Sequence, residues 1–232
     1  MSEEIPAPYS YPEPPPLRRQ PIAWVTWTIV VSTVAVFLLQ LLYLHLKGDD
    51  ILGNTLAFSP EAFAEGRYWT LVTYAWAHAV VLFNDPGLFW LHLVSNMIPL
   101  ICLGPALERF IGAWRYLGLY VGGAIFSALV WYFFNSSDNE PIIGASGAVF
   151  ALIVAAGTAA PRTRIVVYLL YILPIPMTLW MLAVVACVIE VACILFGWMP
   201  EIAHTAHLGG AAFGFLYLLT LRLLWRRHGL VD

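Results

Sequence analysis

Long apolar runs separated by short polar segments make up most of this chain. A membrane-spanning helix needs about 20 mostly apolar residues. We count six spans, of which the fourth is short and rich in small residues: Ile22–Leu46, Leu88–Leu107, Trp114–Phe134, Ile142–Ala160, Pro174–Gly197 and Ile202–Trp225. Apolar Ile165–Leu173 is too short to cross and precedes Pro174 and Pro176, so we interpret it as an interfacial lead-in to the fifth span. The pattern predicts an all-α membrane protein, a six-transmembrane helix bundle.

The composition agrees with a chain that has lipid as its solvent. It is 61% hydrophobic and 11% charged, whereas soluble domains are nearer half apolar and a quarter charged. The net charge of −3 comes with no basic patch that would suggest nucleic acid. Cys102, Cys187 and Cys193 lie in apolar runs and are expected to pack as small hydrophobes rather than to form disulfides.

Outside the spans, the chain has a proline-rich N-terminal segment and one long loop. Residues 1–20 are rich in proline and contain no apolar stretch, which predicts a disordered cytoplasmic tail rather than a signal peptide. The membrane domain then covers residues 21–228, with a long external first loop at residues 48–87. In that loop, the aromatic-rich segment Tyr68–Ala77 is expected to lie amphipathically along the membrane interface.

Basic residues determine the expected orientation. Of the lysines and arginines, only Lys47 and Arg67 fall on the side of the membrane that carries the long first loop. The other side carries Arg18, Arg19, Arg109, Arg115, Arg162, Arg164, Arg222, Arg226 and Arg227. Because arginine-rich ends stay cytoplasmic, both termini are predicted to be cytoplasmic. The cytoplasmic positive ends and the short loops suit a multi-pass protein of a bacterial or archaeal plasma membrane, with an organelle membrane as the alternative. No internal repeat suggests a transporter.

Four polar side chains fall at similar depth in the second, fourth and sixth spans: His92, Asn96, Ser146 and His207. These spans run in the same direction, so the four groups can meet in one layer a turn or two below the outer surface. Polar groups inside a bilayer are costly and usually functional. Each motif alone also fits helix packing or a hydrogen-bonded core histidine.

The spacings favour nucleophilic catalysis. His92 and Asn96, four residues apart, share one helix face. Small residues flank Ser146, and Gly210 and Gly214 let the sixth span press against the fourth. A serine beside a histidine base is a minimal activated nucleophile. The Ser146 N–H and the side chains of His92 and Asn96 are candidate donors to an oxyanion.

Three motifs carry a family resemblance: His92-Leu93-Val94-Ser95-Asn96, Gly144-Ala145-Ser146-Gly147, and His207 followed by small residues that include Gly210 and Gly214. In this order they resemble the motifs of the rhomboid intramembrane serine proteases, over about residues 22–225. The resemblance implies a rhomboid-like bundle with a Ser146–His207 dyad and an oxyanion and substrate-binding site including His92, Asn96 and Gly144. It also implies that Phe150 packs against the base, that a water-filled cavity opens outward, and that single-span membrane proteins in the lipid bilayer are cleaved near their outer boundary. No cofactor or metal is implied.

The chain departs from the family pattern in places. Gly66-Arg67 stands where a Trp-Arg pair is usual, and Phe150 lacks the hydroxyl often found there. Members of the family often have a second histidine a few residues before the His-x-x-x-Asn motif. The best match here, His78, lies much farther before His92, and we assign it no catalytic role. His204 is expected to face the headgroups, with tuning of the base as the alternative, while Glu190 either pairs with a neighbouring helix or lines the cavity.

Other functions fit the sequence less well. A metalloprotease would need a His-Glu-x-x-His run, an intramembrane aspartyl protease two aspartates in spans, and a serine–lysine dyad a lysine other than loop residue Lys47. A catalytically silent rhomboid-like protein that binds and escorts membrane helices shares the fold. A small channel or transporter would need a polar path through the inner half as well.

Overall fold

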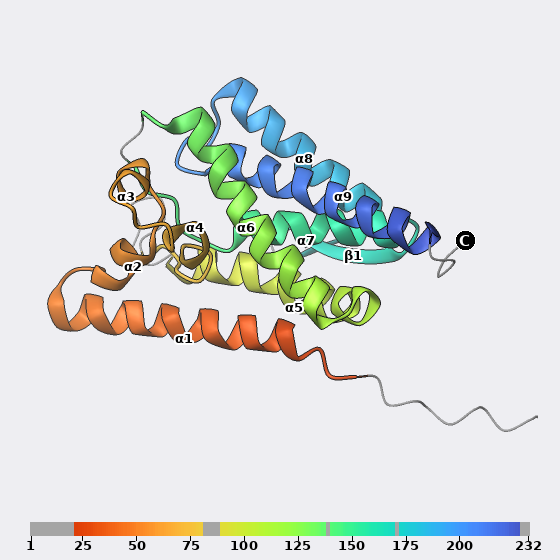
Figure 1. Cartoon of the computed structure of the whole chain (residues 1–232), viewed down its shortest axis with the longest axis horizontal. Coiled ribbons are helices and arrows are strands. Elements are labelled where there is room, and N and C mark those ends of the chain that lie inside the picture. Colours follow the sequence, from red (N-terminus) through yellow and green to blue (C-terminus); the bar gives the residue numbers. More distant parts are fainter. Residues whose placement is uncertain (1–20, 81–88, 138–139, 170–171, 228–232) are drawn as a thin grey trace, which may run out of the picture.

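The computed structural model describes residues 21–80, 89–137, 140–169 and 172–227, so the predicted tail at residues 1–20 lies outside the described part. The elements, in chain order, are α1 (Trp24–Lys47), α2 (Ile51–Leu56), α3 (Pro60–Ala64), α4 (Thr70–Thr73), α5 (Phe89–Ile111), α6 (Ala113–Asn135), α7 (Ser146–Ala159), β1 (Arg164–Leu169), β2 (Leu173–Thr178), α8 (Leu179–Phe196) and α9 (His204–Arg227). Figure 1 shows a helical bundle with α2, α3 and α4 gathered at one end.

Five of the helices, α1, α5, α6, α8 and α9, are long and apolar enough to cross a membrane. The fourth predicted span, Ile142–Ala160, contains a shorter helix, α7, of 14 residues. At about 1.5 Å per residue, α7 is shorter than a hydrocarbon core of about 30 Å. The predicted run Ile142–Ala160 is therefore helical only from Ser146 onward, and a non-helical segment leads into it.

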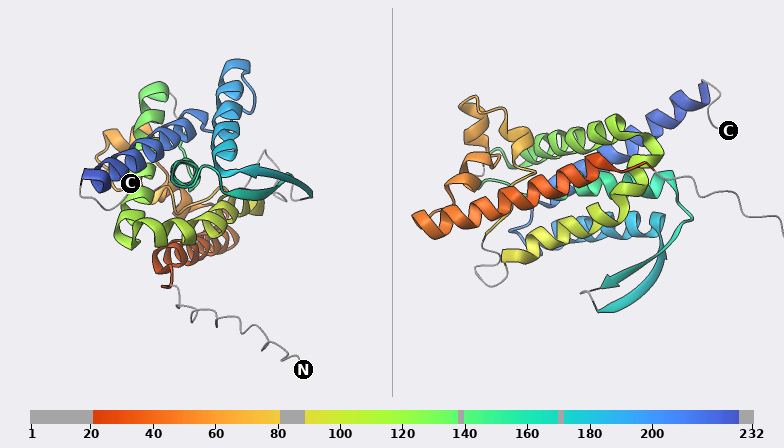
Figure 2. Two further views of the ribbon diagram at one scale, coloured as in Figure 1. Left: turned by 90° about the vertical axis from the view of Figure 1, so that its right-hand side faces the viewer. Right: turned by 90° about the horizontal axis from the view of Figure 1, so that it is seen from below.

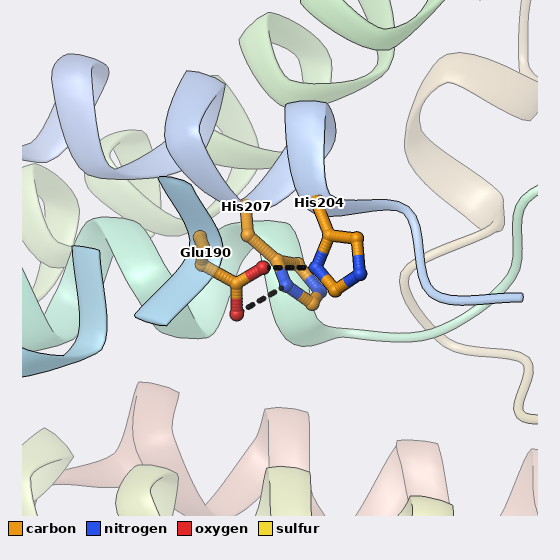
Figure 3. A group of neighbouring side chains, drawn as sticks. All are labelled: Glu190, His204 and His207. Carbon is orange, nitrogen blue, oxygen red and sulfur yellow. Dashed lines mark hydrogen bonds and ion pairs between the residues drawn. The ribbon is translucent and has the colours of Figure 1, made fainter. Parts of the chain in front are cut away.

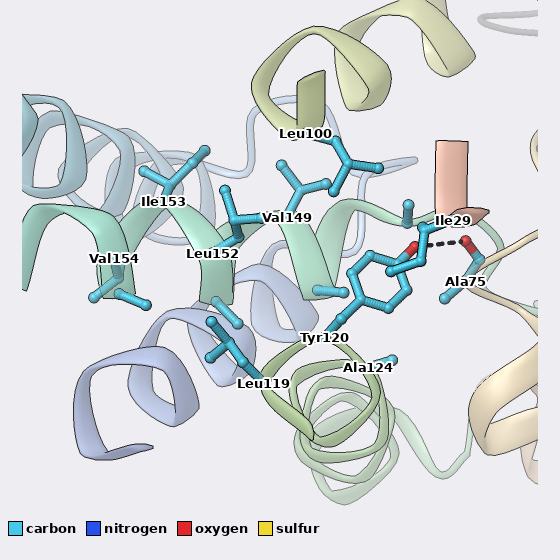
Figure 4. Packing of buried hydrophobic residues seen from close by; sticks show 14 of the residues in the cluster. Ile29, Ala75, Leu100, Leu119, Tyr120, Ala124, Val149, Leu152, Ile153 and Val154 are labelled. Atoms are coloured by element: carbon cyan, nitrogen blue, oxygen red, sulfur yellow. Dashed lines mark hydrogen bonds between the residues drawn. The ribbon is translucent and has the colours of Figure 1, made fainter. Parts of the chain in front are cut away.

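The short α7 lies at the centre of the bundle, where the end-on view of Figure 2 shows the other helices around it. It packs against α5, α6, α8 and α9. Its residues are mostly alanine, glycine and small aliphatics and are almost all buried. Small side chains let neighbouring helices approach closely where apolar burial gives no advantage over lipid. Figure 4 shows this core, with Leu152 and Val149 of α7 near Leu119 and Tyr120 of α6.

The contact between α7 and α9 depends on the predicted glycine stripe. A β-carbon at Gly210 would overlap the Gly147 carbonyl, and one at Gly214 would overlap the Ala151 carbonyl. The two backbones are therefore in direct contact, which is the close approach expected from the spacing of these glycines.

The described part of the first loop, residues 48–80, folds onto the bundle. Asp50 caps α2 and Ser59 caps α3 through their side chains. Tyr68 and Trp69 are exposed, but Tyr74, Ala75 and Ala77 are buried, and the Tyr74 hydroxyl donates to the Ala124 carbonyl at 2.8 Å. The predicted amphipathic element Tyr68–Ala77 therefore has an exposed start and a buried end beside α6, and its place at the membrane interface stays a prediction.

A β-hairpin replaces the predicted lead-in and the start of the fifth span. Strands β1 and β2 pair antiparallel, and Figure 2 shows them extending away from the bundle. Valine, isoleucine and tyrosine favour strands, and Pro174 and Pro176 are tolerated on an edge strand but not inside a helix. Thr178 then caps α8 by accepting from the Met181 N–H at 3.2 Å, so the fifth span begins at Leu179.

A buried carboxylate fixes α1 to α5. Glu108 accepts hydrogen bonds from the backbone N–H groups of Val25 and Thr26 at 3.0 and 2.8 Å, and from the Thr26 hydroxyl. The two backbone donors belong to the first turn of α1, where N–H groups have no acceptor within their own helix. The adjacent Arg109 donates to the Pro21 carbonyl at 3.1 Å. The start of α1 and the ends of α5, α7 and α9 share one end of the bundle, opposite α2 to α4 (Figure 1).

Candidate active site

Ser146 is the first residue of α7, and the backbone before it is held by the first loop. Ile142 and Phe58 exchange two backbone hydrogen bonds, and the Gly144 N–H donates to the Tyr74 carbonyl at 3.0 Å. The next N–H, that of Ala145, donates to Nε2 of His78 at 3.4 Å. Three contacts from one loop therefore set where α7 begins, and with it the position of the half-buried Ser146 side chain.

Gly144 is required by the local geometry. Its φ of +124° is a conformation that L side chains rarely adopt, and a β-carbon there would lie 2.6 Å from Nε2 of His92. The glycine therefore allows both the turn before Ser146 and the close approach of the His92 ring. This is how the predicted site residues Gly144 and His92 come together.

His207 of α9 contacts Ser146 directly. Its Nε2 lies 2.8 Å from the Ser146 Oγ, a hydrogen-bond distance between two residues 61 positions apart. The imidazole also stacks on the Phe150 ring, with centroids 4.5 Å apart and planes 7° from parallel. Phe150 lies one turn after Ser146 on α7, so one helix carries both the hydroxyl and the surface that orients the ring.

His92 and Asn96 lie on α5 as expected, but they are held differently. Nδ1 of His92 accepts from the Ala79 N–H at 3.2 Å, so a neutral ring carries its proton on Nε2, the atom that faces Gly144. Asn96 is buried and uses its amide to donate to the His92 carbonyl at 2.8 Å. His92 therefore presents a donor beside Gly144, two residues before Ser146, whereas Asn96 is bonded to its own helix.

His78, to which the sequence assigned no catalytic role, is part of the same assembly. It is fully buried, and its ring centroid is 5.0 Å from that of His92. Burial and, to a smaller extent, the nearby His92 together lower the pKa of His78 to about 3. The ring is therefore neutral near neutral pH and can accept the Ala145 hydrogen bond. The Gln40 side chain bonds both the N–H and the carbonyl of His78, at 3.0 and 2.9 Å.

Glu190 and His204 are buried against His207, not turned toward the headgroups. Oε2 of Glu190 lies 2.6 Å from Nδ1 of His204, and Oε1 lies 3.1 Å from Nδ1 of His207. Figure 3 shows the carboxylate facing both rings. The headgroup-facing interpretation of His204 is wrong, and of the two options for Glu190 the pairing with a neighbouring helix holds. Because an unpaired carboxylate in a span is costly, the sequence indicated that Glu190 has a partner, but it did not identify that partner.

The remaining predicted features lie away from this site. Arg67, the match to the family's first-loop arginine, forms an ion pair with Glu65 at 2.8 Å on the surface. An open groove of about 830 Å³ lies beyond the C-terminal end of α7, lined by residues such as Ala160, Pro161 and Trp180. Because Ser146 starts α7, this groove is at the opposite end of the helix from the serine and is not the outward-opening cavity that the resemblance implies.

The fold and these contacts define a multi-pass helical membrane protein in which a serine and a histidine from two packed helices share a hydrogen bond. The chain belongs to the rhomboid family, because the Rhomboid domain model matches residues 65–224. The resemblance drawn from the three motifs is thereby confirmed.

Named relatives agree on the family. The chain is 31% identical over 141 residues to presenilin-associated rhomboid-like protein A, mitochondrial, of Danio rerio, covering 60% of this chain and 36% of that protein. It is 26% identical over 262 residues to RHOMBOID-like protein 5 of Arabidopsis thaliana, covering 94% and 76%. It is 32% identical over 133 residues to Rhomboid protein 1, mitochondrial, of Saccharomyces cerevisiae, covering 56% and 37%. The chain thus spans only about a third of the two mitochondrial proteins, and their names give no support to the expected plasma membrane of a prokaryote.

Proposed function

We propose that this protein is an intramembrane serine endopeptidase with Ser146 as nucleophile and His207 as general base. The observation that carries the proposal is the 2.8 Å contact between the Ser146 Oγ and the His207 Nε2. A nucleophile within hydrogen-bond reach of its base, with the base oriented by a further group, is the general signature of an activated serine. Phe150 and Glu190 both contact His207 and supply that orientation.

The proposed reaction is acyl transfer in two halves. His207 accepts the Ser146 proton while Oγ attacks the scissile carbonyl carbon, and then returns the proton to the leaving amine as the C–N bond breaks. In the second half His207 takes a proton from water, whose oxygen attacks the acyl-serine ester, and Ser146 recovers the proton as it leaves. Each proton taken is returned, so the cycle needs no metal or organic cofactor.

Donors for the tetrahedral oxyanion lie on the Gly144 side of Ser146. His92 directs its Nε2 toward this point, and the N–H of Ser146 has no acceptor within α7 because it belongs to the first turn. Asn96 can contribute only by its second amide N–H, since the first is bonded to the His92 carbonyl. We therefore expect His92→Ala to lower kcat more than Asn96→Ala.

The proposed topology has six crossings with both termini cytoplasmic. Five helices are long and apolar enough to span the membrane. We take α7 with its lead-in as the remaining crossing, the fourth in chain order. The end of the bundle where α1 begins and α9 ends also carries the arginines near the ends of α5, α7 and α9 (Figure 1). By the positive-inside rule this end faces the cytoplasm, and Ser146, at the opposite end of α7, lies near the external surface.

Substrates are proposed to be single-span membrane proteins, cut near their outer membrane boundary. The half-buried Ser146 lies at the end of the bundle covered by α2 to α4, and apolar residues of the surrounding spans face the lipid from which a substrate helix would arrive. The alternative is a rhomboid-like protein that binds membrane helices without cleaving them. The intact contact between Ser146 and His207 favours the protease.

The test is cleavage of a model single-span substrate reconstituted with the purified protein in proteoliposomes. The wild type should release two fragments, while Ser146→Ala and His207→Ala should each leave the substrate intact. Thr158→Ala serves as a control, because it also removes a hydroxyl from α7 but lies at the far end of the helix. Cleavage by Ser146→Ala at the wild-type rate would refute the proposal.

A further inference from the structure

We infer that Glu190 is a positioning residue for His207, and that His204 holds Glu190 in place. The dyad predicted from the sequence would then be a three-membered chain, Ser146–His207–Glu190, fixed at its end by a second histidine. This inference rests on the proposed function, because it assigns the carboxylate to the orientation of the catalytic base.

The three residues are close enough for this role. Glu190 on α8 and His207 on α9 are joined by the 3.1 Å contact between Oε1 and Nδ1, on the side of the ring opposite Ser146. The side chains of Glu190 and His207 are each about nine-tenths buried. Glu190 is also the one charged residue in α8, whose hydropathy is the highest of the five spanning helices. Such a residue is costly in a span unless it is partnered.

The contacts of His207 also indicate where its ring protons lie. For His207 to accept the serine proton on Nε2, its own ring proton must sit on Nδ1, the atom that faces Glu190. A carboxylate at that atom favours this tautomer and stabilises the imidazolium that forms during the reaction. Without it, the ring could place its proton on Nε2 and lose its function as a base.

His204 supplies the other half of the arrangement. Its Nε2 lies 3.0 Å from the carbonyl oxygens of both Trp198 and Met199, which can only accept, so Nε2 carries a proton. Its Nδ1 meets the other carboxylate oxygen at 2.6 Å, a distance that requires one proton between the two atoms. Glu190 is therefore held from one side by His204 and directs its second oxygen to His207.

A metal ion is the competing explanation, because Glu190, His204 and His207 offer ligand atoms within 4.8 Å of one another. Zinc ligands lie about 2.0–2.2 Å from the ion, so two ligand atoms in a tetrahedral site are about 3.3 Å apart. The 2.6 Å separation of Glu190 and His204 is shorter and fits a shared proton instead. A metal on Nδ1 of His207 would also force the ring proton onto Nε2, where it blocks the base.

The experiment compares kcat and KM for Glu190→Ala, Glu190→Gln and Glu190→Gln/His204→Ala, with Glu108→Ala as the control. Glu108 is the matched choice, because it is also a buried carboxylate bonded between helices, but at the far end of the bundle. We expect Glu190→Ala to lower kcat about a hundredfold to a thousandfold with KM within about threefold. Glu108→Ala should lower the Tm while leaving kcat per folded molecule unchanged.

Glutamine keeps the inference testable if the alanine variant fails to fold. Its amide N–H can donate to the unprotonated Nδ1 of a neutral His204, which leaves its oxygen for the Nδ1 proton of His207. We therefore expect Glu190→Gln to lose only about tenfold in kcat. In the double variant the amide is free to turn its N–H toward His207, and kcat should fall to the level of Glu190→Ala. A low-field imidazole N–H resonance in ¹⁵N-histidine spectra should disappear in both Glu190→Ala and His207→Ala.

Three results would overturn the inference. They are a folded Glu190→Ala variant with wild-type kcat, a low-field resonance that survives in that variant, and activity that is lost on chelation and restored by zinc. If the wild type cleaves nothing, the proposed function fails, but the resonance still decides whether Glu190 holds His207.

Discussion

The imidazole of His78 accepts a hydrogen bond from the amide of Ala145, the residue immediately before the proposed nucleophile. The two residues are 67 positions apart, and His78 is itself held by Gln40 of α1. The first loop thus forms part of the support for Ser146, so its residues should affect catalysis without contacting substrate.

Replacement of His78 tests this support. We predict that His78→Ala lowers kcat about tenfold or more and lowers the Tm, because it removes a buried acceptor and leaves the Ala145 N–H unsatisfied. His78→Gln, which can still accept through its side-chain oxygen, should retain most of the rate. Turnover of a model substrate and thermal unfolding in detergent measure both effects, and a wild-type kcat for folded His78→Ala would remove the loop from the support of Ser146.

The same residue predicts a pH dependence of stability. The pKa of buried His78 is about 3 against an ordinary value of 6.5, so the unfolded chain takes up this proton first as the pH falls. The contribution of His78 is complete above about pH 6.5 and is lost progressively toward pH 3. Between pH 7 and pH 5 the loss is about 2 kcal/mol. We expect the Tm of the wild type to fall more on this acidification than that of His78→Gln, and equal falls would contradict the assignment.

Gly214→Ala tests the direct contact between α7 and α9. A methyl group there would overlap the Ala151 carbonyl, so the helices must separate at a cost of about 1–3 kcal/mol. We expect a lower Tm and, because Ser146 and His207 sit on these two helices, a lower kcat. Ala212→Val on the exposed face of α9 is the control and should change neither. A Gly214→Ala variant as stable and active as the wild type would show that the helices do not touch there.

Phe150 tests how stacking orients the base. Its ring lies parallel to that of His207 at 4.5 Å, and Phe150→Ala would free the imidazole to rotate away from Ser146. We predict about a tenfold fall in kcat with little change in KM, since a small misplacement of a catalytic group is costly. Phe150→Tyr keeps the stacked ring and should retain the rate. Equal rates for Phe150→Ala and Phe150→Tyr would show that stacking is not needed.

Much of the membrane architecture could be predicted from hydropathy. The long helices α1, α5, α6 and α9 begin and end within a few residues of the predicted runs. The hairpin could not be found in this way, because Ile165–Leu173 and the start of Pro174–Gly197 are both apolar and hydropathy does not separate a strand from the helix after it. The two prolines were the local signal for a strand boundary.

In the candidate site too, some features could be predicted from the sequence and others could not. Ser146, His207 and His92 could be predicted because each lies in a motif and at a shared depth. The contacts of Glu190 and His78 could not, because they depend on how α8 is rotated about its axis and on how the first loop folds back. Those are long-range packing choices that no local spacing encodes. A carboxylate in a span signalled that a partner exists, but only the fold identified His204 and His207 as that partner.

The most direct test of the Ser146–His207 pair is labelling with a serine-directed fluorophosphonate probe, followed by mass-spectrometric mapping of the adduct. The wild-type protein should carry the adduct on Ser146, labelling should fall sharply in His207→Ala, and Ser146→Ala should remain unlabelled. An adduct on another serine, or equal labelling of Ser146 with and without His207, would contradict the activated serine on which the account depends.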